Sequence, residues 1–202
     1  ITTLLAFFID GSLGFLAATL QGWLDQLLSR GVDVLMAIPS LIFALLLMTI
    51  ASAWAGSEKG LLTFYMVIII AVIDSTRVFR LARAVGANIV VMDYIEAAKL
   101  RGEGTWYLIR REILPNSTAP LIAEFGLEFC FVFLLIAGLS FLGLGIQPPT
   151  ADWGSMVREN ATLISFGDIT PLIPAAAIAL LTVAVNFVVD WMLFRSSGLK
   201  EQ

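Results

Sequence analysis

The sequence contains no histidine and only one cysteine, and charged residues make up only 14% of its 202 residues. Without histidine, the chain cannot build a serine–histidine catalytic pair or a histidine-bearing zinc motif. The single cysteine, Cys130, excludes an internal disulfide framework, and because it lies in an apolar run we interpret it as a small buried hydrophobe. No G-x-x-x-x-G-K-[ST] phosphate loop occurs in the sequence, so the chain does not bind ATP by that route.

What the chain does have is apolar residues, which make up 59% of the sequence and give a mean hydropathy of +0.92. Soluble domains contain about 45–50% apolar residues, and a run of about 20 apolar residues is long enough to cross a bilayer as a helix. Five such runs predict an all-α polytopic membrane protein with spans at residues 2–20, 40–55, 61–79, 120–142 and 171–194. Because the first residue is isoleucine and the first span begins at once, we expect the chain to be a fragment.

The positively charged residues predict how the spans are oriented. In the five-span scheme ten of the twelve fall on one side, and the positive-inside rule makes that side cytoplasmic. These ten are Arg30, Arg77, Arg80, Arg83, Lys99, Arg101, Arg110, Arg111, Arg195 and Lys200, whereas Lys59 and Arg158 fall on the other side. The third span runs on into three arginines at positions 77, 80 and 83, which share one helical face. They are predicted to anchor the span at the cytoplasmic interface, or to contact lipid phosphates or a partner ATPase.

Shorter segments outside the spans also carry predictions. Residues 21–34 alternate apolar and charged side chains at helical spacing, which is typical of a short interfacial helix. Asp152 is placed to cap a helix that runs to about Asn160. The glycines at positions 138, 143 and 145 are candidates for close helix approach.

A polar segment between the third and fourth spans predicts a helix-turn-helix. Residues 93–100 combine good helix formers with an amphipathic pattern, and Gly102 and Gly104 then end the helix. A second helical run, at residues 106–113, is predicted to end at Leu114-Pro115 because proline lacks a backbone N–H. This segment therefore predicts a docking loop on the cytoplasmic side.

The same segment resembles the signature loop of the permease subunits of binding-protein-dependent ABC importers. Glu96-Ala97-Ala98, Gly102 and Leu114-Pro115 fall on the spacing of that family's EAA loop. One position departs, since Glu112 stands where the family has isoleucine, with Ile113 beside it. The later run LSFLGLG at residues 139–145, with Pro148-Pro149 and Asp152-Trp153-Gly154, is similar to the dipeptide, oligopeptide and nickel branch of these permeases. The resemblance covers nearly the whole chain.

The resemblance implies one permease domain over residues 1–202, with a cytoplasmic coupling loop at 86–116 and an external loop at 143–170. Residues 96–102 would form a coupling helix seated in a cleft of an ATPase subunit. Glu96 would anchor it through charge-assisted hydrogen bonds, Ala97 and Ala98 would allow close contact, and Gly102 would allow the turn.

The resemblance also implies a transport function. The chain would be the transmembrane subunit of an ATP-driven importer for peptides or a related small solute, in a bacterial or archaeal inner membrane. It would have no catalytic site or metal of its own, because ATP and Mg²⁺ would be bound by partner subunits. The expected partners are a second homologous permease, two ATPase subunits, an extracytoplasmic binding protein and the lipid bilayer, but no nucleic acid. Such permeases usually have one more amino-terminal span, giving six in a full chain.

Acidic residues in or near spans are costly in lipid and usually face an interior, a cavity or a partner. The set comprises Asp10, Asp74, Glu124, Glu128 and Asp190, and all except Asp74 are candidates for a pathway. Glu124 and Glu128 share a helix face, so they would either meet a cationic group such as a peptide amino terminus or pair with arginines of a partner permease. A proton-coupled secondary transporter that uses these carboxylates, and a structural subunit without a pathway, remain open. An intramembrane aspartyl protease would need paired aspartates within a glycine-rich motif, and no such motif surrounds these aspartates.

Overall fold

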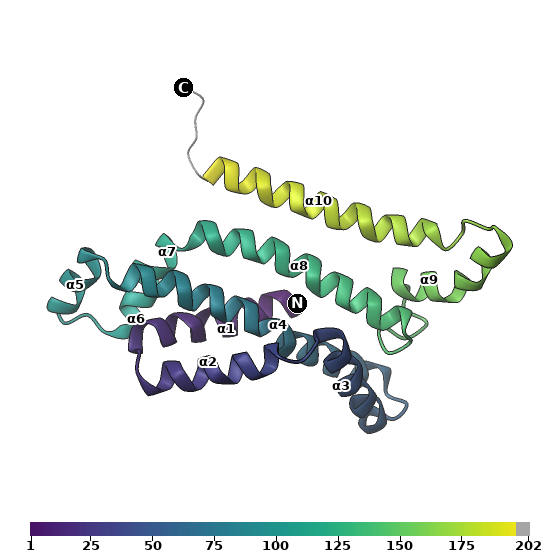
Figure 1. The fold of residues 1–202 in the computed structure, drawn as a ribbon, viewed down its shortest axis with the longest axis horizontal. Helices are drawn as coiled ribbons and strands as arrows, with labels where there is room; N and C mark the ends of the chain where they lie inside the picture. Colours follow the sequence, from purple (N-terminus) through teal and green to yellow (C-terminus); the bar gives the residue numbers. More distant parts are fainter. Residues whose placement is uncertain (197–202) are drawn as a thin grey trace.

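The structure, a computed structural model, describes residues 1–196 as an all-α chain with no strand in that range (Figure 1). The helices, in chain order, are α1 (Thr2–Leu20), α2 (Trp23–Met36), α3 (Ser40–Ala55), α4 (Lys59–Val90), α5 (Asp93–Leu100), α6 (Thr105–Tyr107), the π-helical turn η1 (Leu108–Ile113), α7 (Leu114–Asn116), α8 (Thr118–Phe141), α9 (Trp153–Asn160), the 3₁₀ turn η2 (Ala161–Phe166) and α10 (Leu172–Ser196). The prediction of an all-α polytopic protein is confirmed. Of the predicted cytoplasmic cations, Lys200 lies outside the described residues.

Four helices of the described chain are long and apolar enough to cross a membrane, namely α1, α4, α8 and α10. The predicted span at residues 40–55 coincides with α3, but this helix has only 16 residues. It qualifies only together with α2, from which it is bent by 89°. The structure thus has four spans, or five if the bent pair counts as one.

Helix α2 is the predicted amphipathic helix, and it lies against α4. The guanidinium group of Arg83 on α4 donates two hydrogen bonds to Asp25 on α2, and the distance from Nη2 to Oδ2 is 2.6 Å. Figure 1 shows α2 running alongside the bundle before the chain turns into α3. This ion pair therefore fixes α2 to the third predicted span.

Helix α4 is longer than the span predicted at residues 61–79, because its 32 residues continue past three arginines. The arginines do not form one cluster at the end of a span. The guanidinium carbon of Arg77 lies 3.8 Å from the ring centroid of Phe131, midway along α8, and Nη1 of Arg80 lies 3.3 Å from the sulfur of Met36. With Arg83 bound to α2, each arginine has a different partner within the described chain, and their anchoring role at the interface stays a prediction. The predicted loop at 86–116 correspondingly begins inside α4.

Helices α1 and α4 approach each other through small residues. A Cβ atom at Gly14 would lie 2.6 Å from the carbonyl oxygen of Phe79 and 2.7 Å from Cβ of Ala82. On the other helix, a Cβ atom at Gly86 would lie 2.9 Å from Cβ of Ala18. Small residues four positions apart on both helices give this seam the form of a close membrane-helix contact. Gly138, a predicted contact glycine, has only one side-chain atom nearby, at 3.9 Å.

Two apolar cores hold the bundle together, one toward each end. The first, which we call the α5-end core, combines buried residues of α1, α4, α5 and η1, namely Phe15, Ala82, Ile89, Val90, Ile95, Ala98, Leu108, Ile109 and Ile113. The second combines buried residues of α3, α4 and α8, namely Ala44, Met48, Met66, Ile70, Ile73, Val132 and Leu139. Among the described helices, α4 alone supplies buried members of both cores, although Leu121 of α8 also packs against the first.

The end of the bundle opposite α5 holds α9 and η2 (Figure 1). The carboxylate of Asp152 accepts a hydrogen bond from the backbone N–H of Ser155 at 2.9 Å, so the predicted cap of α9 is confirmed. The Lys59 ammonium donates to the carbonyl of Pro148, which ties the start of α4 to the segment after α8. Nearby, the Thr170 hydroxyl and backbone N–H donate to Asp168 and lower the pKa of that carboxyl.

Candidate functional site

Helix α5 carries the EAA signature and has two different faces. Ile95 and Ala98 are fully buried in the α5-end core. Glu96 and Ala97 are exposed, and Leu100 is 83% exposed. We expected both alanines to allow contact with an ATPase, but only Ala97 lies on the outer face. Ala98 cannot do so, because it packs within its own chain.

The turn after α5 is a Schellman motif centred on Gly102. The backbone N–H of Gly102 donates to the carbonyl of Lys99 at 2.9 Å, and that of Glu103 donates to the carbonyl of Ala98 at 3.2 Å. These bonds satisfy carbonyl groups at the helix end and require a left-handed residue between them. Gly102 has φ of 84°, a conformation that glycine adopts without steric cost. The glycine of the signature spacing thus turns the chain back toward the bundle.

The chain returns through η1, and the helical run ends one residue beyond the predicted end at Leu114-Pro115. The helical path continues to Asn116 and accommodates Pro115 just after a π-helical turn. A π turn is wider than an α-helical turn and is often found at functional sites. Ile113 is fully buried in the α5-end core, whereas Glu112 is only half-buried. The apolar anchor that the family has one position earlier is therefore supplied by Ile113.

The second candidate site is the set of acidic residues in the spans. Asp10 on α1, Asp74 on α4 and Glu128 on α8 are buried, and Glu128 has no exposed surface. Glu124 is half-buried, whereas Asp190 on α10 is exposed. The structure thus brings three acids from three helices into one interior, and it does not gather the four predicted pathway residues along one surface.

Arg77 also lies beside this interior, although the sequence predicted it among the cations on the cytoplasmic side. The charged groups near enough to act on Glu128 electrostatically are Asp74, Arg77, Glu124 and Asp10. Arg77 follows Asp74 by three positions on α4, and Phe131 follows Glu128 by three positions on α8. This matching spacing across two helices could not be seen before their register was known. No group of three or more His, Cys, Asp or Glu residues in the described chain could hold a metal ion.

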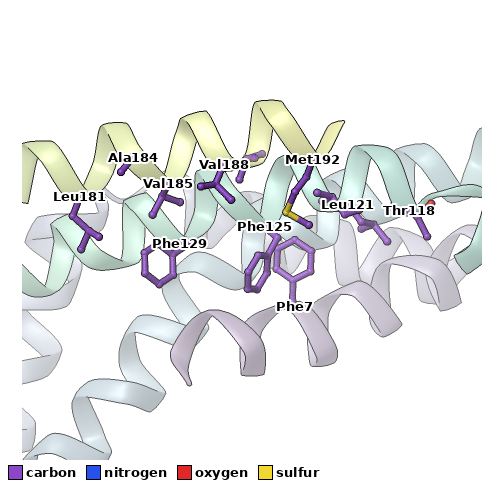
Figure 2. A pocket seen from close by; sticks show the side chains of 13 residues that line it. Phe7, Thr118, Leu121, Phe125, Phe129, Leu181, Ala184, Val185, Val188 and Met192 are labelled. Carbon is purple, nitrogen blue, oxygen red and sulfur yellow. The ribbon is translucent and has the colours of Figure 1, made fainter. Parts of the chain in front are cut away.

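An apolar groove of about 700 Å³ lies between α8 and α10 and reaches Phe7 of α1 (Figure 2). The rings of Phe7 and Phe125 meet edge-on inside it, with centroids 5.2 Å apart. Gly126 admits Val189 of α10, because a Cβ atom there would lie 2.1 Å from Cγ2 of that valine. None of the buried acids lines this groove, so it is separate from the acidic interior.

Comparison with known proteins identifies the family. The family model described as "Binding-protein-dependent transport system inner membrane component" matches residues 11–196. The chain is 30% identical over 94% of its length to the glutathione transport system permease protein GsiD of Pectobacterium atrosepticum, of which it covers 60%. It is 35% identical over 88% of its length to the di/tripeptide transport system permease protein DppC of Pseudomonas aeruginosa, of which it covers 56%. It is also 35% identical, over 90% of its length, to the probable D,D-dipeptide transport system permease protein DdpC of Escherichia coli, of which it covers 58%.

The chain therefore spans somewhat more than half the length of these curated relatives. The resemblance to the peptide branch of the permeases, which rested on the EAA spacing and the LSFLGLG run, is confirmed. From the match over residues 11–196 together with the apolar helices, the chain belongs to the family of inner membrane components of binding-protein-dependent transport systems.

Proposed function

We propose that this chain is the transmembrane subunit of an ATP-driven importer and that it forms part of the translocation pathway for peptides or a related small solute. Its relatives are named for the transport of glutathione, di/tripeptides and D,D-dipeptides, which supports this substrate class. Its partners are a second homologous permease, two ATPase subunits that bind ATP and Mg²⁺, and an extracytoplasmic binding protein. The assembly sits in a bacterial or archaeal inner membrane.

The observation that carries the coupling role is the division of α5 into a fixed face and a free face. Ile95 and Ala98 lock the inner face into the α5-end core. Within residues 1–196, the Glu96 side chain makes no hydrogen bond or ion pair, although it is exposed beside Ala97 and Leu100. Because one face of α5 is packed against the spans and the other is free to bind a partner, movement of a bound subunit would be transmitted to the spans.

The outer face also has the composition of a docking surface. Leu100 is 83% exposed on this face, and charged residues flank it in the sequence of the helix and its turn. The exposed charges nearest to it along the helix and its turn are Glu96, Lys99 and Arg101. An apolar centre with a polar rim is the usual arrangement of a protein interface. This segment lies at the cytoplasmic end of the bundle, where an ATPase subunit would bind.

The test replaces Glu96 with alanine in the complete protein and uses Asp93→Ala as the matched control. Both residues are exposed acids in the first turn of α5, so both changes remove one negative charge from the same helix end. The assembly is purified from detergent, co-purifying ATPase subunits are quantified by mass spectrometry, and ATP-driven uptake is measured in vesicles. We expect Glu96→Ala to lose the ATPase and the uptake, while Asp93→Ala retains both. Equal recovery of ATPase in the two variants would contradict docking through the signature.

The acidic interior favours a second candidate, a proton-coupled secondary transporter. Buried carboxyl groups in spans are typical of proton pathways. The two functions differ in their energy source. Uptake that persists without ATP and collapses when a protonophore dissipates the proton gradient would support the secondary transporter, whereas uptake that follows ATP alone would exclude it.

A further inference from the structure

Glu128 is the most deeply buried ionisable group among the described residues, and it lacks partners. Its side chain has no exposed surface, and neither carboxyl oxygen has a hydrogen-bond partner within residues 1–196. Oδ2 of Asp74, on the facing helix α4, is in the same situation. Burying a charged carboxylate without partners is very unfavourable, so an interior of this kind needs a compensating ligand.

The charges around Glu128 do not balance. Asp10 faces it from α1, Asp74 and Arg77 from α4, and Glu124 from its own helix. Helix α3 has no charged residue, and the charged residues of the two other helices packed on α8, Arg158 and Glu159 of α9 and Asp190 and Arg195 of α10, are all exposed. The three buried acids therefore share one nearby cation.

That cation is already engaged elsewhere. The Arg77 guanidinium lies over the ring of Phe131, which is itself 47% exposed, so Arg77 is drawn toward the surface of the α4–α8 seam. No hydrogen bond joins Arg77 to Glu128 or to Oδ2 of Asp74. Arg77 therefore acts on the innermost carboxyl groups only through its charge at a distance.

Few ligands could compensate the charge of these buried carboxyl groups. The acids are not close enough together to hold a metal ion, and the apolar groove between α8 and α10 does not reach them. A proton needs neither a cavity nor a coordination shell. We propose that Glu128 is a proton-binding site at the junction of α1, α4 and α8, so that loss of this proton loosens the packing of the three helices. The inference does not depend on the coupling role of α5.

The experiment compares the pH dependence of stability in the complete, detergent-solubilised protein and its variants. Glu128→Gln has nearly the same shape as the protonated side chain and cannot release a proton. The unfolding midpoint of the parent is expected to fall as the pH rises from mildly acidic to mildly alkaline values, since an unpaired charge then appears inside the bundle. This slope is expected to be lost in Glu128→Gln and kept in the matched control Glu124→Gln, which changes the half-buried acid one turn away. An unchanged slope in Glu128→Gln would overturn the proposal.

A second measurement does not rely on any variant folding. Infrared spectroscopy detects the carbonyl stretch of a protonated carboxyl group, which an ionised carboxylate lacks. At neutral pH the unmodified protein is expected to show such a band, and the band is expected to shift when glutamate is labelled with carbon-13. The proposal would be overturned if the band is absent, or if its frequency does not change when glutamate is labelled. ATP-driven uptake, measured in parallel, tests the proposed importer function, and its outcome does not depend on either of these results.

Discussion

Adding a single methyl group at Gly14 should weaken the contact between α1 and α4. The new Cβ atom would lie 2.6 Å from a backbone oxygen and 2.7 Å from Cβ of Ala82. Neither atom can move away by rotating a flexible side chain, so the helices must separate. Overpacking of this kind costs about 1–3 kcal/mol.

The steric cost at Gly14 can be measured separately from helix propensity, because Gly11 lies on the same helix and a Cβ atom there would meet nothing within 4 Å. Gly14→Ala and Gly11→Ala both gain the same helix propensity, about 1 kcal/mol. Their difference in unfolding free energy therefore reports the steric cost alone. For a chain of this size, about 1–3 kcal/mol corresponds to a midpoint difference of roughly 2–12 °C.

The assay is thermal unfolding of the two variants in the same detergent, followed by circular dichroism. We expect Gly14→Ala to unfold at a lower temperature than Gly11→Ala by an amount within that range. If the two variants unfold at the same temperature, the close approach at Gly14 is not a determinant of stability, and the reasoning fails.

Three further perturbations separate roles within the α5 end and the α2–α4 contact. Ala98→Leu should destabilise the protein by about 1–3 kcal/mol because Ala98 is fully buried, whereas Ala97→Leu should change stability by less than about 0.5 kcal/mol and instead reduce ATPase recovery in a pull-down. Gly102→Asp should cost about 1 kcal/mol because of its positive φ and abolish uptake with the protein still in the membrane. Gly104→Asp, at a position with φ of −79°, should preserve uptake, and equal uptake in the two variants would refute the turn's role. Asp25→Asn should lower stability by about 0.5–1 kcal/mol, since its arginine partner is 42% exposed; an unchanged midpoint would mean that the ion pair does not hold α2.

The apolar runs of the sequence predicted the spans well where hydropathy alone decides the structure. The first span was predicted at residues 2–20 and coincides with α1, and those at 120–142 and 171–194 differ from α8 and α10 by one or two residues at each end. The helix was expected to continue beyond its apolar run through the three arginines, and α4 does so, but its further extension to Val90 was not predicted. Here Arg77, Arg80 and Arg83 are accommodated by a ring, a thioether and a carboxylate on other helices. Such partners depend on helix register, which one sequence does not reveal.

The signature loop was predicted in position but not in its orientation. The spacing of Ile95 and Ala98, three apart on a helix, was a visible sign of the buried face. The adjacent alanines nevertheless suggested a common role, and only the α5-end core separates them. The π-helical turn before Pro115 was not predictable, because local sequence rules treat proline as a helix stop and cannot anticipate a wider turn.

The length of α4 has a mechanical consequence. Its 32 residues make a helix about 48 Å long, and among the described helices it is the one that places buried members in both apolar cores. If α4 tilts as one body, a tilt of roughly 5° about one end displaces the other end by about 4 Å. Force applied at α5 therefore need not pass through loops or through a chain of small side-chain shifts. Under the proposed coupling role of α5, such a force would reach the opposite end of the bundle, at α3 and α8, as a displacement whose size is set by the length of one helix.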